Sequence, residues 1–184
     1  MNILLEKLKK QFDVHGEPRR ENLHFIDVAP LHLPALLTHL RDYEGFSQLI
    51  FLTAVDRLED GQFQLTYMLA DAASRQNLGV RVHIDRKDAT MTSVAHLWRH
   101  AKTYQRELKE MFGIDFPGSP GVDDPFILEG WEELPPMRRD FDTKAYSEKT
   151  YFPRPGRSTT EPREAMKAID PDYPALPAMK GGEA

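Results

Sequence analysis

The sequence predicts an α+β domain, an antiparallel or mixed sheet covered by helices, with a proline-rich, extended C-terminal arm. Two observations support this prediction. Segments with strand and helix periodicity alternate over residues 1–114. Eleven of the 14 prolines then follow Phe116, and prolines at that density exclude long helices and central strands. We therefore expect a domain of residues 1–114 and an arm of residues 115–184.

The elements of the domain follow from local patterns. Residues 2–12 and the segment from Pro30 to Gly45 carry apolar residues at helical spacing, which predicts two helices. A strand is expected between them at residues 23–28. Three further strands with short polar links are expected at residues 47–55, 63–69 and 80–85. They predict an antiparallel meander with the apolar 47–55 strand at its centre and one face of the 63–69 strand mostly in water.

The last predicted helix, either unbroken or kinked near Trp98, organises the rest of the chain. Its apolar stripe recurs at helical spacing from Val94 to Met111, and Ser93 is a suitable N-cap. Gly113 suits the left-handed position just after a helix. Three charged residues lie beside the stripe, namely Arg106, Glu107 and Glu110. A helix that is apolar inside and charged at its margin is suited to meet a partner protein.

The arm carries more than linker chemistry. Aromatic residues lie between its prolines at a density that disordered tails lack, so it needs a surface on which to bury them, on its own domain or on a partner. Arg138, Arg139 and Asp140 directly precede Phe141. Arginine and aromatic residues are enriched at protein interfaces, which favours an interface over a phosphate site for this cluster.

Composition excludes several classes of protein. The 184 residues are 40% hydrophobic and 29% charged, and no apolar run approaches the roughly 20 residues that a membrane-spanning helix needs. The absence of cysteine excludes disulfides, thiolate metal sites and iron–sulfur ligation by this chain. Residues 1–114 balance 15 acidic with 15 basic side chains, so residues 115–184 account for the net charge of −5. A chain without a basic stripe is not expected to bind nucleic acid.

Two other functions stay open on the residues alone. His96 and His100 have the i, i+4 spacing of zinc ligands and, with Glu107, could serve a stand-alone metal or carboxylate enzyme, although the adjacent glutamate and a third ligand are missing. The strands could also form the platform of an RNA-binding module, which the negative charge disfavours.

Residues 104–114 resemble the signature of the thirty-kilodalton, or C, subunit of complex I, the respiratory NADH:quinone oxidoreductase. The signature is matched by Arg106, Glu107, Glu110, Met111, Phe112, Gly113 and Ile114. Further family motifs are similar to Phe116, Gly118 and Pro120, to residues 128–131, and to residues 136–141. Gln105 and Ser119 stand where the family has Glu and His.

The resemblance implies a non-catalytic structural subunit of the peripheral arm of an enzyme that couples electron transfer to proton or ion translocation. It implies no cofactor on this chain, with NAD, FMN, iron–sulfur clusters or a NiFe centre in partner subunits. The implied partners are the large (forty-nine-kilodalton, hydrogenase-like) subunit and other peripheral-arm subunits, on the cytoplasmic face of the inner membrane. The alternative is the equivalent subunit of an energy-converting membrane-bound [NiFe] hydrogenase. The predicted interface residues are Arg106, Glu107, Glu110, Phe112, Trp131, Arg138, Arg139, Asp140 and Phe141.

Overall fold

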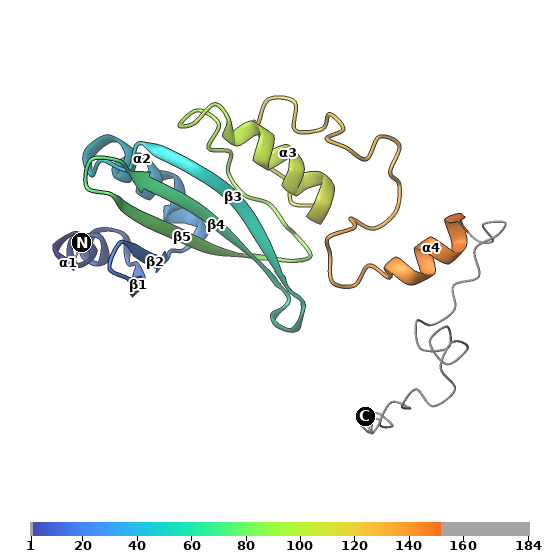
Figure 1. The fold of residues 1–184 in the computed structure, drawn as a ribbon, viewed down its shortest axis with the longest axis horizontal. Coiled ribbons are helices and arrows are strands. Elements are labelled where there is room, and N and C mark those ends of the chain that lie inside the picture. Colours follow the sequence, from blue (N-terminus) through green and yellow to red (C-terminus); the bar gives the residue numbers. More distant parts are fainter. Residues whose placement is uncertain (1, 152–184) are drawn as a thin grey trace, which may run out of the picture. The chain divides into compact units, whose positions relative to one another are not determined.

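The computed structural model describes residues 2–151 (Figure 1). The chain divides into two compact units, residues 1–142 and residues 143–184, and the described part of the second is α4 (Thr143–Tyr151). The first unit thus continues beyond residue 114, where we placed the end of the domain. Whether residues 1–114 fold without the segment that follows stays a prediction.

The first unit contains three α-helices and five strands, with short 3₁₀ turns at Pro30–His32 and Leu58–Asp60. The helices are α1 (Asn2–Phe12), α2 (Leu33–Tyr43) and α3 (Ala101–Phe112). The strands are β1 (His15–Arg20), β2 (Leu23–Asp27), β3 (Gln48–Arg57), β4 (Gln62–Asp71) and β5 (Gln76–Asp85).

The strands form one mixed sheet in the order β1-β2-β5-β4-β3. Strands β2 and β5 are parallel, and the other neighbours are antiparallel. The α+β class and the antiparallel or mixed sheet are therefore confirmed, as is the β3-β4-β5 meander. Strand β1 was missed because Gly16 and Pro18 indicate a turn, yet an edge strand tolerates proline.

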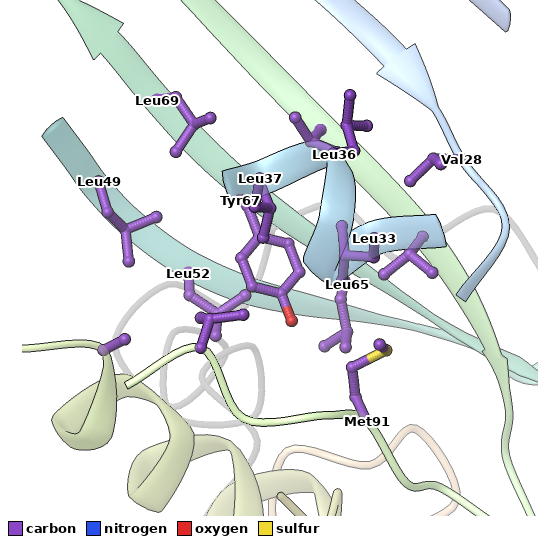
Figure 2. Packing of buried hydrophobic residues seen from close by; sticks show 14 of the residues in the cluster. Val28, Leu33, Leu36, Leu37, Leu49, Leu52, Leu65, Tyr67, Leu69 and Met91 are labelled. Carbon is purple, nitrogen blue, oxygen red and sulfur yellow. The ribbon is translucent and has the colours of Figure 1, made fainter. Parts of the chain in front are cut away.

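One face of the sheet carries the core. Leu33, Leu36 and Leu37 of α2 point at Leu65 and Tyr67 of β4, as Figure 2 shows. All five side chains are fully buried. Helix α1 lies beside α2, with the rings of Phe12 and His39 5.5 Å apart. Non-directional burial of apolar area of this kind is the main force that holds helices onto a sheet.

The predicted central position of the 47–55 strand is wrong, because β3 is the edge of the sheet. No further strand among the described residues pairs with this edge; instead, side chains of α3 and of the residues before it donate hydrogen bonds to carbonyl groups around the start of β3. The carbonyl oxygens of Ser47, Leu49 and Ile50 lie 2.8, 2.8 and 2.9 Å from Trp98 Nε1, His100 Nε2 and Tyr104 Oη. Covering an edge in this way prevents unwanted strand pairing.

The organising helix is shorter than predicted, since α3 begins at Ala101 and Ser93 does not cap it. Val94 and Trp98 precede the helix and are buried without being part of it. The Trp98 indole donates its hydrogen bond to the Ser47 carbonyl from there. The left-handed C-terminal residue is confirmed, with a φ of 76° at Gly113.

The predicted wet face of β4 is also wrong, because Gln64 and Thr66 are buried. Arg57 donates to Gln64 Oε1 from Nε at 3.0 Å and from a terminal nitrogen at 2.7 Å. The long side chain of Arg57 on β3 thus gives the buried Gln64 a hydrogen-bond partner.

Candidate functional site

The segment of residues 115–142, here called the strap, follows α3 and is fastened to the domain at two points. At the first point, Glu110 faces away from the core and accepts backbone N–H groups of the strap. Its carboxylate oxygens lie 2.6, 2.9 and 3.1 Å from the nitrogens of Phe126, Ile127 and Leu128. Hydrogen bonds to an ionised acceptor are stronger than neutral ones, so one side chain fixes three consecutive residues.

Two basic residues of α3 complete this first anchor. The guanidinium carbon of Arg106 lies 5.3 Å from the centre of the Phe126 ring, a cation–π distance. Lys109 Nζ lies 2.7 Å from a carboxylate oxygen of Asp115 and also bonds Asp123. The hydrogen bonds with Asp115 and Asp123 raise the pKa of Lys109 above its ordinary value.

The second anchor is a buried carboxylate on β3. Both carboxylate oxygens of Asp56 accept a hydrogen bond from Arg86, one from Nε at 2.8 Å and the other from a terminal nitrogen at 3.1 Å. Its second oxygen also accepts the backbone N–H of Arg139 at 2.8 Å, and Arg86 donates to Asp140 at 2.5 Å. Burial opposes ionisation of Asp56, but the bonds from Arg86 and Arg139 outweigh it and hold the pKa below its ordinary value.

An aromatic pair lies under the second anchor. The guanidinium carbons of Arg86 and Arg138 lie 5.7 and 5.6 Å from the centre of the Phe63 ring. The ring of Phe112 meets Phe63 edge to face, with centroids 6.0 Å apart. Phe112, a predicted interface residue, is 8% exposed and packs into the core of its own chain.

The strap exposes three large apolar side chains, which alternate with acidic residues such as Glu129, Glu132 and Glu133. Ile127 is 69% exposed, Met137 58% and Leu134 37%. Beside them the rings of Trp131 and Phe141 lie 5.6 Å apart, and Trp131 Nε1 donates to the carbonyl of Leu134 at 3.1 Å. Exposed apolar residues gathered on one segment indicate a protein-binding surface.

The predicted interface residues thus divide into groups. Glu110 and Arg106 of α3 contact the middle of the strap. Arg139 and Asp140 are part of the strap and fasten its far end to Asp56 and Arg86, and the neighbouring Arg138 lies over Phe63. The side chain of Glu107, within α3, has no ion pair or hydrogen bond in the described part of the chain. The structure therefore gives most of these charges a partner in their own chain, and their role toward a second protein stays a prediction.

The residues of the metal-enzyme alternative do not converge. His96 lies in an exposed turn and His100 precedes α3, so the two do not share a helix. Within residues 2–151 there is no group of three or more His, Asp or Glu side chains placed to hold a metal ion.

Sequence reasoning missed Asp56 and Arg86. A signal existed, because Asp56 has the same strand parity as the buried Leu52 and Ala54. An ionisable residue at an inward position calls for a buried partner.

Burial also bears on Gln105, which stands where a glutamate is found in the family signature. Gln105 is fully buried, and its Oε1 accepts a hydrogen bond from the Ser93 hydroxyl at 3.0 Å. A neutral amide makes this hydrogen bond without burying a charge.

The family model for the respiratory-chain NADH dehydrogenase, 30-kDa subunit, matches residues 26–147. The chain belongs to this family. The match begins near the end of β2 and covers α2, β3, β4, β5, α3 and the whole strap. The resemblance noted in the signature and strap motifs is therefore confirmed.

Several relatives carry matching names. The C subunit of NADH-quinone oxidoreductase from Moorella thermoacetica is 30% identical over 151 residues, which cover 77% of this chain and 95% of the relative. The C subunit from Ruegeria pomeroyi is 33% identical and covers 74% and 69%. A Pseudomonas fluorescens relative, whose name joins the C and D subunits, is 29% identical over 71% of this chain and 23% of its own length.

Two solved structures share the fold. A chain of the membrane-bound sulfane sulfur reductase, an archaeal respiratory membrane complex, matches with a TM-score of 0.77 and 28% identity, over 87% of this chain and 96% of that one. A trypsin-resistant fragment of Nqo5 (residues 1–134) matches with a TM-score of 0.58 and 22% identity, over 65% of this chain and 96% of that one. No helix within residues 2–151 is long and apolar enough to cross a membrane.

Proposed function

We propose that this chain is a structural subunit of the peripheral arm of a complex I-type NADH:quinone oxidoreductase, and that its outer strap surface binds the large, forty-nine-kilodalton subunit. The observation that carries the proposal is the strap itself. A segment with three exposed apolar side chains, Ile127, Leu134 and Met137, is held in one conformation by two anchors. A preorganised apolar surface loses less conformational entropy when a partner binds.

The identity of the partner is supported by the relatives whose names join the C and D subunits, from Pseudomonas fluorescens and Aquifex aeolicus. A single name for both fits a permanent contact between this chain and the D subunit, which we take to be the large one. In this proposal the redox centres and the nicotinamide, flavin and iron–sulfur cofactors belong to other subunits, and the chain works at the cytoplasmic face of the membrane.

One observation favours a second candidate. The archaeal complex that contains the structural neighbour is named a sulfane sulfur reductase rather than a quinone reductase. The same structural role could therefore be served in a related membrane-bound complex, such as an energy-converting hydrogenase.

The test is purification of the tagged full chain from membranes of its own organism, with identification of the subunits that accompany it. We expect the large subunit in equal amount, and subunits with NADH-binding or hydrogenase-type signatures separate the two candidates. Isolation of the chain alone from solubilised membranes, or a stoichiometric flavin or cluster on the isolated chain, would contradict the proposal.

A further inference from the structure

Two adjacent residues of α3 differ from the other buried charges of the first unit. Among charged side chains described within residues 2–142, those that are partly or fully buried have an ion pair or hydrogen bond with another described residue, except Arg106 and Glu107. Arg106 Nε is completely buried and meets no acceptor there. Lysines and arginines of this part of the chain that lack a carboxylate partner are otherwise exposed, as Arg99 and Lys102 are. The Phe126 ring, 5.3 Å from the guanidinium carbon, offers the cation a π face but no acceptor atom. A buried N–H group without an acceptor is costly, so the arginine calls for a ligand that accepts a hydrogen bond.

Arg106 also lies where a ligand could reach it, because it lines two cavities. One, of about 320 Å³, lies between α3 and the strap and includes Leu128 and Trp131 in its walls. The other, of about 430 Å³, is lined by Lys102, Thr103 and Arg106 of α3 and by residues 120, 121 and 124 of the strap. The cation is therefore recessed between the helix and the strap.

The walls of the cavities select the kind of anion. The planar guanidinium of arginine matches a carboxylate or a phosphate in a two-point hydrogen bond. Besides Arg106 and Lys109, the 320 Å³ cavity is lined by four acidic residues, Glu110, Asp123, Asp124 and Glu133. Their negative charges disfavour a doubly charged phosphate more than a single carboxylate. Apolar Ile127 and Leu134 are exposed on the strap, which suits a protein surface. An aspartate or glutamate side chain of a protein fits these conditions.

We propose that Arg106 receives a carboxylate side chain of the large subunit in the cavity between α3 and the strap, as the charged centre of an apolar contact. This inference rests on the proposed function, which supplies the partner. Glu107 lies about 100° further around the helix. A partner that also reaches Glu107 would therefore meet it with a basic group.

The first test measures the affinity of the purified full chain for the recombinant large subunit of the same organism. Arg106→Gln should weaken binding by about 30-fold or more, because it removes one member of a desolvated charge pair. Arg99→Gln is the matched control, since Arg99 is exposed and lacks an ion-pair partner among the described residues; it should bind within about twofold of wild type. Arg106→Gln binding equal to wild type would overturn the inference.

The second test identifies the ligand group directly and does not depend on how well Arg106→Gln folds. Arg106→Lys places an amine in the cavity, and a water-soluble carbodiimide joins amines only to carboxylates. Treated together with the large subunit, this variant should give a cross-link from position 106 to an aspartate or glutamate of that partner. A complex whose position 106 couples only to Asp124 of its own chain, or not at all, would overturn the inference while leaving the proposed function intact. Failure of the wild-type chain to bind the large subunit would overturn both.

Discussion

The second anchor gives the sharpest prediction about stability. Asp56→Asn keeps the shape of the side chain but removes the charge that faces Arg86. The Asp56 side chain is 1% exposed and that of Arg86 is 11% exposed, so the pair is buried. Removing one member of such a pair typically costs 3–5 kcal/mol. Because Arg86 keeps Asp140, we expect the lower end, about 3 kcal/mol, which for a chain of this size is a fall of roughly 6–12 °C in melting temperature.

The assay is urea unfolding of the full chain, with Asp60→Asn as the matched control. Asp60 is an exposed carboxylate of the same hairpin, 3.6 Å from Arg57, so its loss should cost at most about 1 kcal/mol. The double variant Asp56→Asn, Arg86→Met should be less destabilised than the sum of the single changes, because it leaves no unpaired charge. An Asp56→Asn variant within about 0.5 kcal/mol of wild type would refute the buried anchor.

Three further predictions concern the strap and the end of α3. Glu110→Ala removes the acceptor of three backbone N–H groups, so amide exchange at residues 126–128 should accelerate, while in the control Glu107→Ala it should not. Gly113→Ala should cost about 1–2 kcal/mol, because φ is 76° and the new Cβ would lie 3.3 Å from Pro135; a melting temperature unchanged in this variant would contradict the left-handed turn. The pKa of Asp56 is lowered, so its contribution to stability is fully present above the ordinary aspartate pKa and is lost as pH falls through the lowered pKa. Asp56→Asn should therefore reduce the loss of stability on acidification. An Asp56→Asn variant that loses stability with falling pH as wild type does would contradict the ion pair.

The elements with strong periodicity could be predicted from the sequence. Helices α1 and α2 and strands β2, β4 and β5 lie where their patterns place them, because each pattern reflects at least one buried face. The position of β3 could not be predicted, since an apolar run is equally expected in a central strand and in an edge strand covered by Trp98, His100 and Tyr104. That covering depends on side chains about fifty residues away in the sequence.

The candidate site was predicted in part: Asp56 and Arg86 were missed, and so were the contacts of the residues that were named. The two charge clusters, at Arg106 to Glu110 and at Arg138 to Asp140, were both expected to face a partner. In the structure Arg139 meets Asp56 of β3, and Asp140 meets Arg86, which directly follows β5. Local sequence could not reveal this, because the strap returns to a strand 83 residues earlier. The consequence is that Arg138→Glu should lower the stability of the free chain, since Arg138 lies over Phe63 and beside Asp140.

The central claim is that the outer surface of the strap binds the large subunit. The chain has no cysteine, so single substitutions allow thiol labelling at chosen positions in the full chain. Ile127→Cys and Met137→Cys, both at exposed positions, should label at least about tenfold more slowly in the purified complex than in the free chain. Leu31→Cys, at a position that is 84% exposed before α2, is the control and should label equally in both. Equal labelling of Ile127→Cys in the free chain and in the assembled complex would contradict the account.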